Sequence, residues 1–464
     1  MTLIKSISGI RGTIGGKADE GLTPLDAVKY ASAYGTWVLS QQESKNAKIV
    51  IGRDARMSGA MISSLVANTL IGMGLDVIDL GLSTTPTVEM AVTELKASGG
   101  IILTASHNPK HWNALKLLNH KGEFISEKNG QEILSLAAAS DFSYAEVDRL
   151  GKYSVNNDFL DTHIQRILEL PYVDVKAIRA ANFSVVLDAI NSSGAIAVPA
   201  LLKQLGVNNV KVIFGEVHGD FAHNPEPLPE HLAELSKTVL AEKAHLGISV
   251  DPDVDRLAFV CEDGNMFGEE YTLVAVADYV LQKNKKGNTV SNLSSTRALR
   301  DVTEKAGGAY AAAAVGEVNV VNKMKETSAV IGGEGNGGII LPELHYGRDA
   351  LVGIAIFLTH LAKSAMTVSA LRATYPAYFI SKNKIELGPG IDVDAILAGM
   401  KQQYSAQPLN TVDGLKIEFG KEWVHLRKSN TEPIIRIYSE SSSETRADEL
   451  AKKIMADIRQ LSNK

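Results

Sequence analysis

The sequence predicts an α/β protein with three related α/β domains, each built from βαβ units with a mixed sheet, and a smaller C-terminal α+β domain, around a central cleft. Length and an internal repeat support this prediction. The chain has 464 residues, which is too long for one ordinary core and favours three or four domains. We expect domains over residues 1–152, 153–252, 253–370 and 371–464. Small molecules bind preferentially in the clefts between such domains.

The internal repeat consists of a strand-like apolar run, a polar turn, a helical stretch, a glycine and a second apolar run. It occurs at residues 49–81, 183–215 and 288–316. Strands that alternate with helices of this length predict right-handed βαβ units and parallel or mixed sheets. Ligands of such sheets favour the carboxyl ends of the strands, so the loops that follow these strands are candidate sites.

From about residue 371 the chain does not repeat this pattern. It closes with a strand-like run, IIRIYSE, and a helical stretch. The spacing of that stretch predicts an apolar face formed by Ala447, Leu450, Ala451, Ile454, Ile458 and Leu461. Near the N-terminus, Thr23-Pro24 predicts the start of another helix, with threonine as its cap and proline at its first position.

The composition excludes several classes of partner. A net charge of −6 gives no general attraction for nucleic acid, so an anionic ligand needs a local cluster of basic groups. No apolar run approaches the roughly 20 residues that span a bilayer, and the N-terminus lacks the features of a signal peptide. The single Cys261 cannot form an internal disulfide. We therefore expect a cytoplasmic protein with no nucleic-acid or membrane partner.

The strongest local signal is the segment Thr-Ala-Ser-His-Asn-Pro at residues 104–109, which follows the apolar run 100–103. It places Ser106 at the end of a strand. Because Asn108 precedes a proline, its backbone favours an extended or turn conformation, and we expect the serine hydroxyl on an exposed loop. A serine in a turn is by itself more often structural than nucleophilic. The Gly-x-Ser-x-Gly pattern of α/β-hydrolases is absent.

A second cluster, Asp251, Asp253 and Asp255, follows the apolar run 246–250. Alternate carboxylates of an extended segment point the same way, so three oxygen donors can converge on one cation. Without a cation their charges would repel one another. Oxygen ligands without nearby Cys or His favour Mg²⁺ over zinc, and the spacing differs from that of an EF-hand. An acidic turn at a solvated strand end is the alternative.

Two further loops carry groups suited to a sugar phosphate. Residues 427–433 combine a guanidinium, hydroxyls, an amide and turn backbone N–H groups, with Arg436 following, and this set suits a dianionic phosphate. A polar hairpin loop is the alternative. The glycine-rich residues 332–338 carry Glu334 and Asn336, which suit pairs of sugar hydroxyls. No Gly-Lys-Ser/Thr follows them, which disfavours a nucleotide-binding loop.

Together, the four loops resemble those of the α-D-phosphohexomutase family: phosphoglucomutases, phosphomannomutases and phosphoglucosamine mutases. The resemblance covers essentially the whole chain, and the loops occur in the family's order. It implies a phosphoserine at Ser106 and Mg²⁺ held by Ser106 and the three aspartates. It also implies a sugar site at Glu334 and Asn336, and a phosphate site at Arg427, Ser429, Asn430, Thr431 and Arg436.

The reaction implied by the resemblance interconverts hexose 6-phosphate and hexose 1-phosphate through a hexose 1,6-bisphosphate, which also serves as activator. Residues 8–12, Ser-Gly-Ile-Arg-Gly, look like the family's N-terminal element, which would bring Arg11 to the phosphoserine. Lys116 stands where the family has a catalytic lysine. His107 and Lys116 are the candidates for general acid and base. Arg256 would help to hold the acidic loop and the substrate. The resemblance is compatible with a monomer or a homodimer.

The sequence also departs from the family. Many members have a histidine, proposed to act in proton transfer, where this chain has Gly338, so the general base stays open. Glu317 occupies a position that varies between branches, and Asn113-Ala114 replaces the usual Asn-Gly. Glucosamine, glucose and mannose phosphates remain candidate substrates, with glucosamine favoured by the N-terminal element and the phosphate loop. A Mg²⁺-dependent sugar phosphatase and a non-catalytic sugar-phosphate sensor are the alternatives.

Overall fold

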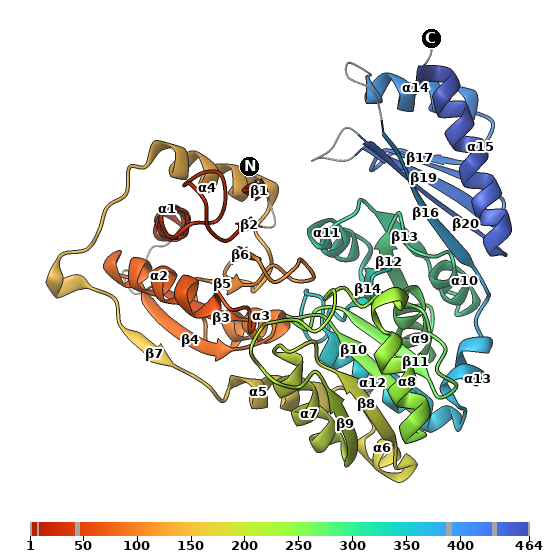
Figure 1. The fold of residues 1–464 in the computed structure, drawn as a ribbon, viewed down its shortest axis with the longest axis horizontal. Helices are drawn as coiled ribbons and strands as arrows, with labels where there is room; N and C mark the ends of the chain where they lie inside the picture. The colour runs from red at the N-terminus through yellow and green to blue at the C-terminus, as the bar shows by residue number, and fades with distance from the viewer. Residues whose placement is uncertain (1, 7–8, 42–46, 387–391, 429–433, 463–464) are drawn as a thin grey trace. The chain divides into compact units, whose positions relative to one another are not determined.

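The computed structural model describes residues 2–6, 9–41, 47–386, 392–428 and 434–462 (Figure 1). These residues form two compact units. The first contains residues 1–272 and 336–369, and the second contains residues 273–335 and 370–464. The chain therefore leaves the first unit and later returns to it. Within the described ranges, no helix is long and apolar enough to cross a membrane.

The first unit begins with a seven-stranded mixed sheet in the order β1-β2-β6-β5-β3-β4-β7. The pairs β5/β3, β3/β4 and β4/β7 are parallel, and the others are antiparallel. Its strands are β1 (Ile4–Ser6), β2 (Gly9–Thr13), β3 (Lys48–Arg53), β4 (Asp76–Leu82), β5 (Gly99–Leu103), β6 (Trp112–Leu118) and β7 (Tyr153–Val155). The helices are α1 (Pro24–Ser40), α2 (Gly59–Gly72), α3 (Thr85–Glu94) and α4 (Glu127–Ala139), with a 3-10 turn at Val147–Arg149.

The two faces of this sheet belong to different cores, because successive side chains of a strand point to opposite faces. Ile49 and Ile51 of β3 pack in the core under α1, α2 and α4. Val50, between them, packs in the core under α3. The helix α1 begins as predicted: Thr23 caps it by accepting the backbone N–H of Asp26, and Pro24 is its first residue.

A second sheet of the first unit has the order β11-β10-β8-β9. The strands β8 (Ser184–Asp188), β9 (Asn209–Ile213) and β10 (Leu246–Val250) are parallel, whereas β11 (Leu257–Cys261) pairs with β10 as an antiparallel hairpin. The loop of this hairpin carries the three aspartates. The accompanying helices are α5 (Phe159–Leu168), α6 (Val175–Ala181), α7 (Gly194–Leu205) and α8 (Ala233–Glu242), with a 3-10 turn at Pro229–His231.

The second unit contains the third repeat. Parallel strands β13 (Tyr310–Ala313), β12 (Asn288–Asn292) and β14 (Ala329–Glu334) pair in that order, and the helices of this region are α9 (Glu269–Lys283), α10 (Ala298–Lys305) and α11 (Glu317–Thr327). The chain then returns to the first unit with β15 (Gly338–Ile340) and α12 (Ala350–Ser364). Helix α12 is buried from residue 350 to residue 361, apolar there except for Thr359 and His360, and it packs against α5, α6 and α7. Helix α13 (Val368–Ala373) follows.

The C-terminal domain, also in the second unit, is an antiparallel sheet in the order β16-β20-β19-β18-β17. Its strands are β16 (Phe379–Glu386), β17 (Leu409–Asn410), β18 (Leu415–Phe419), β19 (Glu422–Lys428) and β20 (Ile434–Ser441). Helices α14 (Val393–Gln403) and α15 (Glu444–Ser462) cover one face, as Figure 1 shows. Of the predicted helical face, Leu450, Ile454 and Ile458 lie in the core with Ile396 and Met400 of α14.

The predicted repeat is confirmed. Each of its three copies is one strand, one helix and a second strand parallel to the first, namely β3-α2-β4, β8-α7-β9 and β12-α10-β13. The fold class is therefore the predicted one, three α/β regions with mixed sheets and a smaller α+β domain at the C-terminus.

Candidate active site

Ser106 lies just beyond the carboxyl end of β5, as predicted, but its side chain is buried rather than exposed, with 7% of the residue accessible. Its backbone is in the left-handed region, with φ of 50°, which is uncommon for a residue other than glycine and often marks a functional turn. The backbone N–H donates to Thr104 Oγ1 at 2.9 Å. The side-chain hydroxyl donates to Asp251 Oδ2 at 2.7 Å.

Arg56 explains why the serine loop is buried and fixed. This side chain, itself buried, donates through Nη2 to the carbonyls of Ser106 and Asn108, and through Nη1 to those of Pro109 and Trp112, all at 2.5–2.9 Å. Its Nε donates to Asp54 at 3.0 Å. All five guanidinium N–H groups are thereby used, and four of them hold backbone carbonyls of one loop.

The three aspartates converge as predicted, but the backbone reason is different. The loop is a turn rather than an extended segment: the Val254 N–H donates to the Asp251 carbonyl, and Val254 has a φ of 62°. Asp251 Oδ1 accepts the N–H groups of Asp255 and Arg256, each at 3.0 Å. All three carboxylates are buried, and one oxygen of each lies within 4.8 Å of the others.

Three side chains from elsewhere in the first unit donate to this acidic loop. Lys116 of β6 donates to Asp253 at 2.7 Å and lies 3.5 Å from Asp255. Thr85, the first residue of α3, donates its hydroxyl to Asp253 at 2.5 Å. Arg348 donates to Asp255 at 2.6 Å. Together with Ser106 on Asp251, they fix one oxygen of each carboxylate.

The remaining oxygens fit a cation. Asp253 Oδ1 and Asp255 Oδ1 are buried and have no hydrogen-bond partner among the described residues. Burial and the charges of Asp255 and Asp253 raise the pKa of Asp251. Burial also opposes ionisation of Asp253, but the Lys116 ammonium outweighs it and holds the pKa of that carboxyl below its usual range. A hard divalent cation such as Mg²⁺ would coordinate the two unpartnered oxygens and relieve the repulsion.

The other predicted catalytic groups of the first unit lie around this centre. His107 Nδ1 is 3.4 Å from Ser106 Oγ, and burial with the charges of Arg256 and Arg348 lowers the pKa of His107 to about 2. Burial would lower the pKa of Lys116, yet Asp253 and Asp255 raise it overall. Arg11 of β2 is paired with Ala114 of β6, so its side chain shares a sheet face with Lys116, two residues further along.

Arg256, predicted to hold the acidic loop and the substrate, ends that loop. Its Nη1 donates to Glu226 at 2.8 Å, while its buried Nε has no partner among the described residues. Asn336, also in the first unit, accepts the Gly338 N–H at 3.2 Å. In the second unit, Glu334 ends β14 and accepts from the Asn292 amide at 2.9 Å and from the Gly316 N–H at 3.1 Å.

The second unit also carries the predicted phosphate residues Arg427 and Arg436, while Ser429, Asn430 and Thr431 lie outside the described residues. Arg427 of β19 is directly opposite Arg436 of β20, which is in turn opposite Lys384 of β16. The neighbouring Ile385, Ile435 and Leu426 point into the core under α14 and α15, so the three cations lie on the other face. Arg427 also contacts Asp413 at 3.0 Å. Like charges directly opposite one another destabilise a sheet, and an anion bound on this face would relieve their repulsion.

Sequence reasoning missed Arg56, Thr85, Arg348 and Lys384. The first three follow or precede recognisable signals: Arg56 follows the first repeat's strand, Thr85-Pro86 starts a helix, and Arg348 precedes the Asp349 that caps α12. Their contacts with the site depend on tertiary packing. Lys384 is found only through its register with β20.

Comparison with known proteins identifies the family. Four family models match in succession: phosphoglucomutase/phosphomannomutase α/β/α domain I at residues 3–144, domain II at 161–264, domain III at 268–378 and the C-terminal domain at 383–457. The chain therefore belongs to the phosphoglucomutase/phosphomannomutase family. It is accordingly an enzyme, an isomerase of the phosphohexomutase type.

Similar proteins and solved structures carry the names of sugar-phosphate mutases. A phosphoglucomutase/phosphomannomutase of Thermococcus kodakarensis is 35% identical over 94% of this chain and 96% of its own. A phosphoglucosamine/phosphogalactosamine mutase of Sulfurisphaera tokodaii is 32% identical over 96% of this chain and 97% of its own. Among solved structures, the fold is similar to that of a putative phosphomannomutase from Thermus thermophilus, with a TM-score of 0.81, 25% identity and complete coverage of both chains.

Proposed function

We propose that this phosphohexomutase interconverts glucosamine 6-phosphate and glucosamine 1-phosphate through a phosphoserine at Ser106 and a hexose 1,6-bisphosphate. The observation that carries the proposal is the hydrogen bond from Ser106 Oγ to Asp251, within a buried set of three converging carboxylates. A hydroxyl held beside a cation site can carry a phosphoryl group, because the cation stabilises the alkoxide that leaves.

Each half-reaction would move one phosphoryl group. In the first, the bond between phosphorus and Ser106 Oγ breaks, a bond to the free hydroxyl of the hexose monophosphate forms, and that hydroxyl loses its proton to a base. The bisphosphate then turns over and returns its other phosphoryl group to Ser106. His107, whose Nδ1 is 3.4 Å from Ser106 Oγ, and Lys116 are our candidates for the proton transfers.

The charged residues of the first unit would stabilise the charge that develops. Mg²⁺, when bound by Asp251, Asp253, Asp255 and a phosphoserine oxygen, would act as a Lewis acid. Lys116 is held by Asp253 and Asp255, and Arg11 lies on the same sheet face; in this proposal both would bind the equatorial phosphoryl oxygens. Thr85 and Arg348 would keep the carboxylates oriented.

The second unit would supply substrate-binding residues. Arg427 and Arg436, together with Ser429, Asn430 and Thr431, would bind the phosphate that does not react, and Lys384 adds a third cation to the same face. Glu334 and Asn336 would bind sugar hydroxyls. A cytoplasmic location and a monomer or homodimer complete the proposal.

The choice of sugar rests on the phosphate loop, on the N-terminal element and on relatives named as phosphoglucosamine mutases. A specific observation supports a second candidate, because the Thermococcus kodakarensis relative with 35% identity is named phosphoglucomutase/phosphomannomutase. Comparing the 1-phosphates of glucosamine, glucose and mannose as substrates would decide. Turnover of glucose or mannose phosphate at a higher kcat/KM would reject glucosamine.

The phosphoserine has its own test. Ser106→Ala should abolish mutase turnover and leave hexose phosphate binding largely intact, because the hydroxyl carries the phosphoryl group but contributes little to affinity. Intact-mass measurement should find one added phosphate on wild type incubated with glucose 1,6-bisphosphate and none on the variant. Near-normal activity of Ser106→Ala would refute the mechanism. Stoichiometric release of inorganic phosphate by wild type would instead favour the phosphatase alternative.

A further inference from the structure

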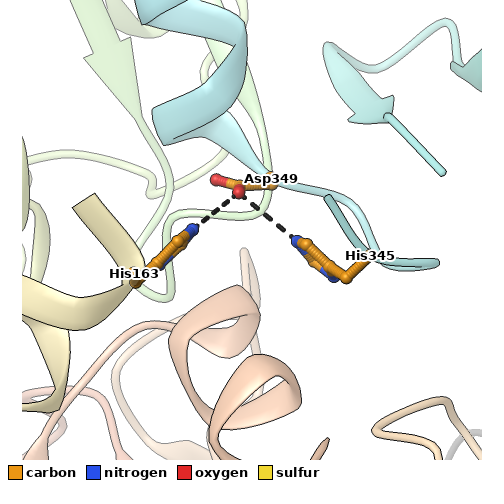
Figure 2. Close-up of side chains that lie close together, drawn as sticks. All are labelled: His163, His345 and Asp349. Carbon is orange, nitrogen blue, oxygen red and sulfur yellow. Dashed lines mark hydrogen bonds and ion pairs between the residues drawn. The ribbon is translucent and has the colours of Figure 1, made fainter. Parts of the chain in front are cut away.

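A second cluster of potential ligands lies in the first unit, apart from the acidic loop. It consists of His163 of α5, and His345 and Asp349 from the segment between β15 and α12. Figure 2 shows the two imidazole rings directed at the same carboxylate from two sides. His163 and Asp349 are completely buried and His345 is about nine-tenths buried. The proposed reaction uses none of these side chains.

The spacing of the three ligand atoms suits a transition-metal ion. His163 Nε2 is 2.9 Å from Asp349 Oδ2, and His345 Nε2 is 3.3 Å from the same oxygen. Two ligands of a tetrahedral Zn²⁺ at bond lengths of about 2.0–2.1 Å are about 3.3 Å apart. Each imidazole nitrogen is therefore within a few tenths of an ångström of that separation from the Asp349 oxygen, and all three ligand atoms lie within 4.8 Å of one another.

Each potential ligand also has a partner that orients it. The far nitrogen of His163, Nδ1, lies 2.9 Å from the Thr87 hydroxyl. The far nitrogen of His345 lies 3.3 Å from Glu89 Oε2 without a well-formed hydrogen bond. Asp349 Oδ1 accepts the N–H groups of Leu351 and Val352 at the start of α12. Metal-binding histidines are usually oriented through their other nitrogen in this way, often by a carboxylate.

Charge balance points in the same direction. Two buried carboxylates, Asp349 and Glu89, flank His345. A divalent cation on the three ligands would place positive charge beside both carboxylates. Protonation of His345 is the other way to place positive charge there.

We propose that His163, His345 and Asp349 bind a divalent transition-metal ion of the Zn²⁺ type, with water as the fourth ligand. Two imidazoles and one carboxylate suit Zn²⁺ better than Mg²⁺, which prefers oxygen ligands. The ion would be structural and would join α5 to the segment before α12, while Thr87 and Glu89 of α3 contact the two imidazoles. Helix α3 also carries Thr85 to Asp253, and Arg348, next to Asp349, donates to Asp255. The ion would therefore stabilise the acidic loop indirectly, by fixing the segments that carry Thr85 and Arg348.

Metal analysis must separate this site from the acidic loop. We would use full-length protein with Asp253→Asn, strip it with a chelator, add one to two equivalents of Zn²⁺ and dialyse it. One equivalent of zinc should remain. Adding His163→Gln or His345→Gln should lower the Zn²⁺ affinity at least about 100-fold, and Thr87→Val, which removes an orienting partner, about 10- to 100-fold. The matched control is His223→Gln, because His223 also contacts a carboxylate, Asp188 at 2.9 Å, but belongs to no group of three potential ligands among the described residues.

A second measurement does not need the histidine and threonine variants to fold. Co²⁺ added to the stripped Asp253→Asn protein should give the intense visible absorption of a four-coordinate ion with nitrogen ligands, and Zn²⁺ should abolish it. Retention of less than a tenth of an equivalent of zinc, or a Co²⁺ spectrum no different from that of aqueous Co²⁺, would overturn the proposal. The cluster would then be a protonated network, in which the two carboxylates outweigh burial and raise the pKa of His345 to about 10. An equal loss of zinc in His223→Gln would overturn it as well.

Discussion

Arg56 shows how a single buried side chain can fix the loop that carries Ser106. Its guanidinium binds the carbonyls of Ser106 and of three further residues of the same loop, which allows the left-handed backbone of Ser106 to persist. The residue gives the serine hydroxyl its direction without contacting it. We class Arg56 as a positioning residue for the proposed phosphoryl transfer.

Arg56→Lys should be far from conservative. An ammonium has three donors on one atom and cannot hold four carbonyls and Asp54 together. With two or more charged hydrogen bonds lost, the free energy of unfolding should fall by about 3 kcal/mol, measured by urea denaturation. The rate constant for Ser106 phosphorylation should fall more than the affinity for substrate. Arg53→Lys is the control, because Arg53 contacts one carbonyl, that of Asp54, at 3.2 Å; an equal effect there would contradict this role.

Asp253→Asn tests the cation site. The substitution removes one of three anions, so Mg²⁺ affinity and turnover should both fall steeply, and excess EDTA should inactivate the wild type reversibly. Titration of activity with Mg²⁺ measures the change. As a control, Asp220→Asn alters an exposed carboxylate that contacts only Lys110 among its described partners. Full wild-type activity in excess chelator would reject the metal assignment.

At the scale of single residues, the sequence predicted those site residues that belong to short contiguous motifs. Ser106 and the three aspartates each follow a strongly apolar strand, so their position at a strand end could be inferred. The burial of Ser106 and the turn at Val254 could not, because they depend on Arg56 and on the hairpin between β10 and β11. Thr85 and Arg348 reach the aspartates from segments distant in sequence, and no local pattern encodes that contact.

At the scale of elements, β16, β20 and β19 combine a conventional core face with an unusual polar face. Their alternation places isoleucines and leucines under α14 and α15 and brings Lys384, Arg436 and Arg427 side by side on the other face. Of these three strands, only β20 was predicted, from the run IIRIYSE. The alignment of the three cations could not be predicted, since a shift of one residue in register would have separated them.

Lys384→Ala should therefore weaken phosphate binding without destabilising the sheet. Loss of one of the three cations should weaken the free energy of substrate binding by about 1–2 kcal/mol. KM should therefore rise roughly five- to thirty-fold, with kcat nearly unchanged. The melting temperature should stay the same or rise slightly, because repulsion with Arg436 is relieved. Steady-state kinetics and thermal unfolding measure both effects. Lys401→Ala on α14, which lies over the core face, should change neither quantity; an unchanged KM for Lys384→Ala would remove Lys384 from the phosphate site.

At the scale of the whole molecule, the internal repeat predicted three α/β regions and the C-terminal pattern predicted the fourth. The sequence did not predict that the first compact unit is completed by residues 336–369. That association depends on α12, whose apolar residues cover α5, α6 and α7. A predominantly apolar helix can be recognised as buried from its sequence, but the elements that it packs against cannot.

Fragments should show this dependence. Residues 376–464 contain the complete C-terminal sheet with its own core, so this fragment should fold alone and give a dispersed amide spectrum. Residues 1–272 lack α12 and Arg348 and should expose apolar surface, bind a hydrophobic dye and aggregate. Adding residues 336–369 to them through a flexible linker should restore a cooperative thermal transition. A monomeric, cooperatively folded 1–272 fragment would contradict the role assigned to α12.

The return of the chain to its first unit also constrains biosynthesis. A ribosome releases Ser106 and the three aspartates long before Arg348 and α12, and residues 273–335 must be translated in between. The nascent chain therefore carries the three aspartates for some time without the Arg348 guanidinium that donates to Asp255. During that interval the exposed surfaces of α5, α6 and α7 are natural substrates for a chaperone. The first unit can therefore be completed only after residues 336–369 have been translated.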